Sequence, residues 1–406
     1  NRSVADIVDA AIQEDAQAIA VSSYQGGHIE FFKYMIDLLR QRGAAHVLVF
    51  GGGGGVIVPR EIAELEAYGV AKIFSPEDGR SMGLDGMIEH MIKAADFDPA
   101  SLHPTGPIGA ASDRWLDVAR AITRAEEGLE VEVPAAVRSA PVLGITGTGG
   151  AGKSSVTDEL VLRFLADFPE LTIAILSVDP TKRKTGGALL GDRIRLNSLG
   201  SDRVFMRSLA TRQAHRALSA NIERSIALCR TAGFDLVLVE SSGIGQADSE
   251  IVDVADLSLY VMTPEYGAAM QLEKIDMLDF ADFVAINKFD RPKALDALRD
   301  VRKQYRRSRG LFEGPGDEEL PVFATVASQF HDRGLNSLYQ GIVRRLAADL
   351  GPPWILESSL AVPTGQPERH PTIPGGYRPT AARLRQQFLA DSMKDVLGAA
   401  LDGSFR

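Results

Sequence analysis

The sequence predicts an α/β protein with two mainly parallel, helix-covered sheets. Short apolar segments of strand length alternate with amphipathic segments of helix length along most of the 406 residues, and this alternation is typical of parallel strands joined by helices. A single hydrophobic core seldom serves so long a chain, so we expect more than one domain. The expected domains are residues 1–96, a helical linker over 97–139, a larger unit over 140–351, and a proline-rich linker with a terminal helix over 352–406.

The first unit contains three apolar segments that predict strands. Ser3 is a suitable cap for a helix through Asp15, and Pro59 stands at a favoured first position of another helix. The expected strands are residues 18–23, 46–50 and 72–75, and the further expected helices are residues 31–42, 59–68 and 84–94. This order indicates a parallel sheet covered by helices.

The larger unit repeats the pattern with more strands. A charged helix over 112–127 precedes it, and a terminal helix is expected over 380–401. The expected strands are residues 142–146, 172–178, 235–239, 257–262, 283–286 and 322–324. Because helical segments separate these strands, the sheet should be mainly parallel and doubly wound.

Composition excludes several classes of protein. The net charge of −10 disfavours a nucleic-acid partner, and the basic stretch over 302–309 is interpreted as a solvated helix face. No apolar run reaches the roughly 18 residues that span a bilayer, and the one cysteine forms no internal disulfide. We therefore expect a soluble, cytoplasmic protein without a membrane partner. Because the chain begins at Asn1 inside a helical pattern, we expect a piece of a longer protein.

A glycine-rich motif between the first strand and first helix of the larger unit indicates nucleotide binding. Residues 147–154, GTGGAGKS, fit the phosphate-binding pattern G-x-x-x-x-G-K-[ST]. Lys153 should reach the outer phosphates and Ser154 should ligate magnesium. The helix N-terminus adds a favourable partial charge. The residues expected around the phosphates are Gly147, Gly149, Gly150, Ala151, Gly152, Lys153 and Ser154.

A second motif indicates that the base is guanine. Asn287, Lys288, Phe289 and Asp290 directly follow a buried strand and match the N-K-x-D pattern of GTPases. They stand at the carboxyl end of a parallel strand, where such sheets bind ligands. A carboxylate at Asp290 can accept hydrogen bonds from guanine N1 and the 2-amino group, which adenine does not offer. The competing interpretation is an ATPase with a chance turn.

Acidic residues after the phosphate loop indicate a magnesium site. Glu240 ends a strand and begins the sequence Glu-Ser-Ser-Gly, where most GTPases carry D-x-x-G. An acid there can hold magnesium directly or through water. Asp179 and Asp192 flank a glycine-bearing segment that could close over the nucleotide.

Three further motifs resemble the chaperone GTPases that service adenosylcobalamin-dependent acyl-CoA mutases. They are SVDPTKRKTGGALLGDRIR over 177–195, VESSGIGQ over 239–246 and TPEYGAAMQLEK over 263–274. The resemblance implies that Arg195 lies near the nucleotide, and that segment 263–274 brings a charged residue, here Lys274, toward it when the partner docks. Lys153, Glu240 and Lys274 are the implied catalytic residues. The implied magnesium neighbourhood is Ser154, Asp179, Asp192, Glu240 and Ser241.

The first unit resembles a cobalamin-binding domain with a flavodoxin-like sheet. Residues 22–28 and 51–55 resemble the S-x-L and G-G elements that grip the cofactor's dimethylbenzimidazole tail. The implied contacts come from Ser22, Tyr24, Gly52 and Gly53, although Tyr24 stands where the pattern has Leu. The D-x-H-x-x-G segment, whose histidine is cobalt's lower ligand, is not in the sequence. His28 is interpreted as a pocket-edge or capping residue, so histidine-ligated cobalamin is not expected on this chain.

The order of the two units resembles the fused isobutyryl-CoA mutases. The resemblance implies Mg²⁺, GTP or GDP and adenosylcobalamin as cofactors, an acyl-CoA mutase domain or subunit as partner, and a homodimer. GTP hydrolysis would gate cofactor loading or protection, and the complete protein would also be a mutase. Two alternatives stay open: a nucleotide-dependent metal or cofactor insertase for another enzyme, which Cys and His clusters would favour, and an interaction module without catalysis.

Overall fold

A computed structural model shows two compact units. Residues 3–23, 26–98, 114–131, 140–179, 193, 196–210, 215–241, 247–267, 277–311, 313, 316–329, 331–355 and 364–367 are described. The first unit comprises Asn1–Arg138, Phe205–Arg207 and Arg224–Gly233, and the second comprises Ser139–Val204, Ser208–Glu223 and Phe234–Arg406. The 97–139 and 352–406 limits of the expected linkers stay predictions.

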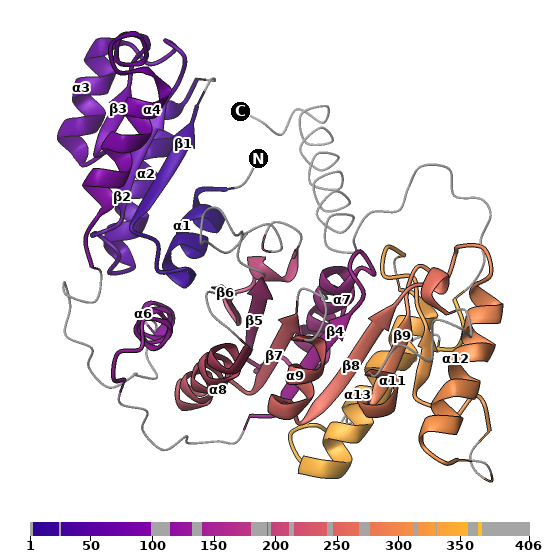
Figure 1. The fold of residues 1–406 in the computed structure, drawn as a ribbon. Helices are drawn as coiled ribbons and strands as arrows, with labels where there is room; N and C mark the ends of the chain where they lie inside the picture. The colour runs from indigo at the N-terminus through magenta and orange to yellow at the C-terminus, as the bar shows by residue number, and fades with distance from the viewer. Residues whose placement is uncertain are drawn as a thin grey trace, which may run out of the picture. The chain divides into compact units, whose positions relative to one another are not determined.

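The first unit holds a three-stranded parallel sheet in the order β1-β2-β3 (Figure 1). The strands are β1 (Ala18–Ser22), β2 (Leu48–Gly52) and β3 (Lys72–Phe74), and the helices are α1 (Val4–Gln13), α2 (His28–Gln41), α3 (Pro59–Tyr68), α4 (Pro76–Ala95) and α6 (Arg114–Glu126). Val8, Phe32 and Leu39 from the helices pack with Val49 and Ile73 from the strands. Burial of these apolar side chains holds the sheet and helices together.

Local caps explain where the helices of the first unit begin. Ser3 and Asp6 form a capping box at α1, as the sequence predicts for Ser3. Helix α4 begins at Pro76, eight residues before the predicted start at 84, because Ser75 caps it through Asp78. Gly83 has a non-helical φ of 67° and divides α4. The helical periodicity of the sequence is therefore interrupted there, and the two turns before Gly83 were not predicted.

The second unit is built on a seven-stranded sheet in the order β10-β9-β8-β4-β7-β5-β6. The five described ladders that join β10 through β5 are parallel, as predicted. The strands are β4 (Val142–Gly147), β5 (Ile173–Asp179), β6 (Val204–Ala210), β7 (Leu236–Ser241), β8 (Leu257–Met262), β9 (Phe283–Ile286) and β10 (Val322–Ala324). Every residue of β4, β7, β8 and β9 is buried, as expected for central parallel strands covered on both faces.

Strand β6 is the element of the sheet that the sequence did not predict. Arg207 and Ser208 interrupt its apolar run, so the segment does not resemble the buried strands beside it. The helices that follow β4 in the chain are α7 (Lys153–Asp167), α8 (His215–Thr231), α9 (Ala247–Val254), α11 (Met277–Phe280), α12 (Ala294–Ser308) and α13 (Arg333–Leu350), with short 3₁₀ turns η2 (Ser198–Gly200) and η3 (Pro264–Tyr266). The part of α8 from Arg224 onward belongs to the first unit.

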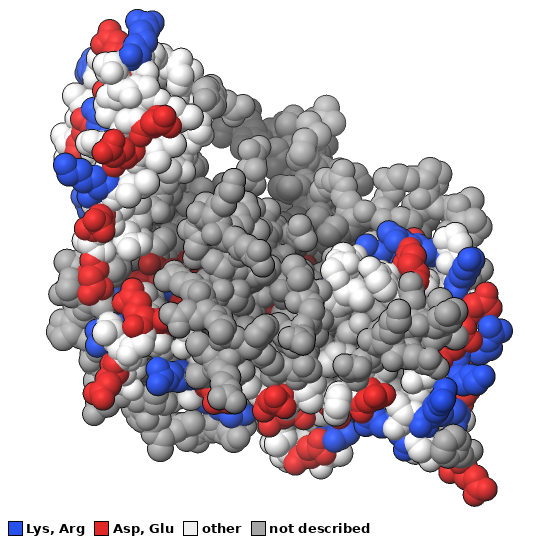
Figure 2. All heavy atoms as spheres, viewed as in Figure 1, with Lys and Arg blue, Asp and Glu red and all other residues white. Residues whose placement is uncertain are grey.

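The basic stretch over 302–309 lies on α12 and the turn after it. Arg302 pairs with Glu318 and Arg306 with Asp317, while Arg309 donates to the Ala281 carbonyl. Figure 2 shows acidic and basic side chains mixed on the described surface at the right, where Figure 1 draws α12. Acidic neighbours therefore offset much of the positive charge of this stretch. Within the described part of the chain, no helix is both long and apolar enough to cross a bilayer.

Candidate functional site

The glycine-rich loop connects β4 to α7 in a conformation that demands glycine. Gly147, Gly150 and Gly152 have φ values of 146°, 74° and 89°, which L side chains rarely adopt. A Cβ on Gly147 would collide with the Val261 carbonyl of β8. The loop therefore runs close against the neighbouring strand, and its last glycine leads directly into α7.

Lys153, the first residue of α7, is 7% exposed and lies across the loop. Its ammonium donates to the carbonyl oxygens of Gly147 at 3.0 Å and Thr148 at 3.3 Å. A helix N-terminus and a lysine thus converge on the same short loop. This arrangement concentrates positive potential where a phosphate group would be bound.

Glu240 connects the end of β7 to the first turn of α7. Its side chain is 4% exposed, and its Oε1 accepts from Ser154 Oγ at 2.8 Å while its Oε2 accepts from Thr157 Oγ1 at 2.9 Å. The next residue of β7, Ser241, has its hydroxyl 2.8 Å from that of Thr146. The structure therefore joins the sequence-predicted Ser154 to Glu240, whereas Ser241 lies with Thr146, because successive residues of a strand point to opposite faces. Carboxylate and hydroxyl oxygens suit a hard cation such as Mg²⁺.

Asn287 ties the phosphate loop to the segment after β10. Its Nδ2 donates to the Ala151 carbonyl at 2.8 Å, and its Oδ1 accepts from the Ala327 N–H at 3.0 Å and from Thr325 Oγ1 at 3.3 Å. Lys288 donates to the Gly150 carbonyl at 2.6 Å. The N-K-F-D segment is therefore bonded to the phosphate loop 136 and 138 residues earlier in the chain.

Asp290 is exposed at the end of this segment, one residue after buried Phe289. Lys288 has a left-handed φ of 59°, so the chain turns sharply before it reaches Asp290. The exposed carboxylate of Asp290 thus follows two residues after Lys288, whose ammonium bonds the glycine-rich loop.

Sequence reasoning missed Thr157 and the Thr325–Ala327 turn. Thr157 stands one helical turn after Ser154, so the two hydroxyls share a face of α7. This spacing in the sequence could have identified Thr157 as a second partner of Glu240. Thr325 follows β10, whose neighbour in the sheet is the strand before Asn287. Its position at the carboxyl end of that strand was the corresponding signal.

Segment 263–274 is described only in its first five residues. Arg291 pairs with Glu265 at 2.5 Å. The hydrogen bond from the Thr263 hydroxyl, followed by the Arg291 bond, lowers the pKa of Glu265 to about 2. The base of this segment is therefore joined to the turn that follows Asp290. The predicted residues Tyr24, Asp192, Arg195 and Lys274 lie outside the described residues, and only the backbone of Asp179 is described, at the end of β5.

Of the predicted cobalamin contacts, Ser22, Gly52 and Gly53 lie at neighbouring strand ends. Ser22 is paired in register with Gly52, and the Ser23 N–H donates to the Gly52 carbonyl at 2.8 Å. A Cβ on Gly53 would approach the Ser23 carbonyl to 2.5 Å, so the two strand ends are too close for a side chain there. At this carboxyl edge of the sheet Ser22 is exposed, Gly52 is half-buried and Gly53 is buried.

His28 is the first residue of α2 and is largely buried. Its Nε2 lies 3.0 Å from Glu61 Oε2. The Val58 N–H, and after it the His28 contact, lower the pKa of the Glu61 carboxyl. The imidazole is thus joined to the capping residue of α3.

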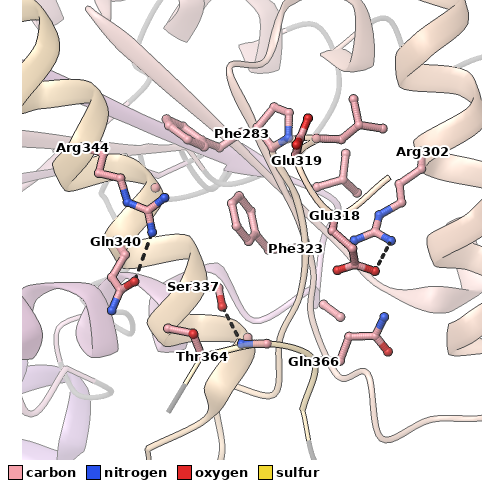
Figure 3. A pocket seen from close by; sticks show the side chains of 17 residues that line it. Phe283, Arg302, Glu318, Glu319, Phe323, Ser337, Gln340, Arg344, Thr364 and Gln366 are labelled. Carbon is pink, nitrogen blue, oxygen red and sulfur yellow. Dashed lines mark hydrogen bonds and ion pairs between the residues drawn. The ribbon is translucent and has the colours of Figure 1, made fainter. Parts of the chain in front are cut away.

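The second unit also holds a pocket of about 530 Å³ beside β10, between α12 and α13 (Figure 3). Phe283 and Phe323 form its apolar floor, and no residue of 147–154 or 287–290 lines it. Around its rim two arginines, Arg302 and Arg344, are balanced by two glutamates. The pocket therefore favours neither sign of ligand charge.

Residues 118–348 match the family model described as methylmalonyl-CoA mutase-associated GTPase MeaB. The chain belongs to this GTPase family. Residues 1–82 match the model of the B12 binding domain. The predicted order, a cobalamin-binding domain followed by a chaperone-type GTPase domain of the α/β class, is thereby confirmed.

Curated relatives carry both parts in one polypeptide. The chain is 54% identical over 399 residues to a fused isobutyryl-CoA mutase of Geobacillus kaustophilus, covering 93% of this chain and 36% of the relative. It is 57% identical over 356 residues to the fused isobutyryl-CoA mutase of Cupriavidus metallidurans, covering 86% of this chain and 32% of the relative. The chain thus spans about a third of the length of these relatives. Among solved structures, a LAO/AO transport system kinase aligns over 76% of this chain and 88% of its own, with 19% identity and a TM-score of 0.44.

Proposed function

We propose that the second unit binds and hydrolyses Mg-GTP and that this cycle gates the loading or protection of adenosylcobalamin in an acyl-CoA mutase. The observation that carries the proposal is the hydrogen-bonded connection of Lys153, Glu240 and Asn287 around one loop. GTPases of this kind catalyse mainly by positioning the nucleotide and stabilising charge.

Each residue of the loop has a distinct role in the proposed reaction. The N–H groups of residues 147–152 bind the phosphate oxygens, and Lys153 exchanges its loop carbonyls for the outer phosphates. Ser154 and Glu240 would hold the magnesium ion. Ser241, Asp179 and Asp192 are proposed to complete its surroundings. When bound, the ion neutralises charge on the phosphates. Arg195 and Lys274 are proposed to approach the nucleotide when the partner docks.

Base selection is assigned to the N-K-F-D segment. Asp290 accepts hydrogen bonds from the guanine N1 and 2-amino groups, and Asn287 keeps the segment in place through the Ala151 carbonyl. Adenine lacks both donors on that edge, so it leaves the carboxylate unpaired. A site built to bond a specific donor rejects a ligand without it strongly.

The first unit is proposed to hold the cobalamin tail through Ser22, Tyr24, Gly52 and Gly53. Its relatives are named as fused isobutyryl-CoA mutases. By that similarity the partner is a mutase domain that isomerises isobutyryl-CoA to n-butyryl-CoA. We further propose that the assembly is a homodimer. The radical chemistry would belong to the cofactor and the mutase.

Calorimetric titration of GTP, GDP and ATP with magnesium tests the nucleotide site. We expect guanine-selective binding that Lys153→Ala and Asp290→Ala both weaken, while Lys303→Ala and Asp296→Ala on exposed α12 positions leave it unchanged. A phosphate-release assay on the same samples separates a GTPase from a silent interaction module. Equal affinity for ATP, or no binding, would remove the base assignment and the chaperone proposal with it.

A further inference from the structure

Asp290, the residue proposed to bind the base, lies on an exposed turn between β9 and α12. Residues 290–293 are all exposed, whereas Phe289 before them is buried. The Arg291 N–H closes the turn onto the Lys288 carbonyl at 3.0 Å. Lys293 stands at the cap position of α12, has a left-handed φ of 65° and makes no side-chain cap bond. The position of Asp290 therefore depends on what holds this short turn.

One side-chain contact ties the turn to the rest of the sheet edge. Within the described part of the chain, the pair between Arg291 and Glu265 is the one side-chain hydrogen bond or ion pair that residues 290–293 make. The arginine nitrogen and the carboxylate oxygen lie 2.5 Å apart. Glu265 belongs to η3, directly after β8, and Arg291 follows β9, so the pair joins the ends of two neighbouring strands.

The Glu265 carboxylate is itself held in place. The Thr263 hydroxyl, then Arg291, then the residue's own N–H lower its pKa to about 2, so the carboxylate is ionised at neutral pH. Thr263 is buried, and a Cβ on Gly267 would lie 2.4 Å from the Ala297 side chain, so η3 is pressed against α12. Arg291 therefore meets an organised anion, and charge-assisted bonds of this kind are stronger and more directional than neutral ones.

Fold stability does not explain this pair. The Arg291 and Glu265 side chains are 45% and 51% exposed, and ion pairs at such exposure contribute little to the stability of a fold. What the pair does restrict is the direction of the chain around Arg291. Since Arg291 is the next residue after Asp290, a fixed guanidinium also limits how far the Asp290 carboxylate can rotate away.

We propose that Glu265 and Arg291 are positioning residues that hold the Asp290 carboxylate in line with the N1 and 2-amino groups of guanine. The inference rests on the proposed function, since it assumes that Asp290 binds the base. Two hydrogen bonds to one carboxylate depend on its orientation, because hydrogen bonds weaken steeply when they bend. Release of the turn at Arg291 therefore speeds nucleotide dissociation and lowers the preference for guanine over hypoxanthine, which lacks the 2-amino group.

Substitutions on both sides of the pair test the proposal in the whole chain. Glu265→Gln keeps the size of the side chain and removes its charge, Arg291→Met removes the guanidinium, and a double variant combines them. Arg345→Gln is the matched control, because it breaks the α13 pair with Asp349, whose side chains are 50% and 47% exposed. The measurements, all with magnesium, are the dissociation rate of fluorescently labelled GDP, the Kd values for GDP and inosine diphosphate, and the thermal midpoint.

We expect each single variant to release GDP about threefold faster and to lower the preference for GDP over inosine diphosphate by about the same factor. The double variant should release GDP no faster than the single variants, because the second change removes a bond that is already lost. Arg345→Gln should match the original protein, and all thermal midpoints should stay within about 2 °C of it.

Three results would overturn the inference: unchanged release in both single variants, additive losses in the double variant, or equal weakening of GDP and inosine diphosphate. Release as fast in Arg345→Gln as in Glu265→Gln would overturn it as well. If the unsubstituted protein prefers neither GDP to inosine diphosphate nor GTP to ATP, the proposed function is refuted instead.

Discussion

The Ser154 hydroxyl donates to the Glu240 carboxylate at 2.8 Å although 86 residues separate the two in sequence. The contact joins the first turn of α7 to the end of β7, and Thr157 occupies the other carboxylate oxygen. The candidate phosphate site and the candidate metal site are therefore parts of one hydrogen-bonded structure. A substitution at one site should alter binding at the other.

Glu240→Gln should raise the magnesium concentration needed for half-maximal GTP hydrolysis about tenfold or more. The substitution preserves size but removes the negative charge that would favour a divalent ion. The measurement is phosphate release against magnesium concentration at saturating GTP. Thr157→Val, which removes one orienting bond and keeps the charge, is expected to have a smaller effect. An unchanged magnesium requirement in Glu240→Gln would exclude Glu240 from the metal site.

Gly147→Ala should destabilise the second unit by about 3 kcal/mol or more. The added Cβ would collide with the backbone carbonyl of Val261, which belongs to a central strand and has nowhere to move. Gly149→Ala is the control, because a Cβ there meets no atom within 4 Å. Its effect on stability should stay within about 0.5 kcal/mol. Thermal or urea unfolding without nucleotide compares the two, and equal stability would show that the strand and loop are not packed as described.

Asp332 should make stability depend on pH near neutrality. Burial raises the pKa of its carboxyl from an ordinary value of 3.8 to about 6. Arg163, Glu159 and His331 are the other titratable groups around it. Because the folded pKa is the higher one, its contribution to stability is present at low pH and is lost as pH rises through about 6. Between pH 5 and 7.5 the loss is about 1.4 kcal/mol.

Asp332→Asn, which does not titrate, removes this dependence. The difference in unfolding free energy between the original and the variant should therefore change by about that amount between pH 5 and 7.5. Urea unfolding at the two pH values measures it. A difference that is constant with pH would mean that Asp332 has an ordinary pKa in the folded protein.

Cobalamin added to this chain should not show histidine coordination to cobalt. His28, which belongs to the predicted 22–28 element, is largely buried and lies 3.0 Å from Glu61. The measurement is the absorption spectrum of cobalamin with the chain, and His28→Ala is the control. A histidine-ligated spectrum that disappears in His28→Ala would reverse the interpretation of His28 as a pocket-edge residue.

Sequence patterns predicted both sheets where the strands are continuously apolar. The limits of β8, β9 and β10 agree with the predicted segments to the residue, because nearly every residue of these segments is apolar, with Ser258 of β8 the exception. Strand β6 was not predicted, because Arg207 and Ser208 break its apolar pattern. The first residues of α4 were not predicted either, because Gly83 interrupts the helical periodicity, although the sequence contains the capping residue Ser75.

The sequence by itself determined the chemistry that this protein can offer: a glycine loop with Lys153 and Ser154, a guanine-type segment ending in Asp290, and an acid at Glu240. Those residues are recognisable because each motif is a short, continuous stretch of sequence at the end of one strand. Only the tertiary structure decided that Asn287 joins Ala151 to Ala327 and that Asp332 joins Val326 to Leu335. The physical reason is that parallel strands bring distant segments to one edge of the sheet, where buried polar groups must find partners that local sequence does not identify.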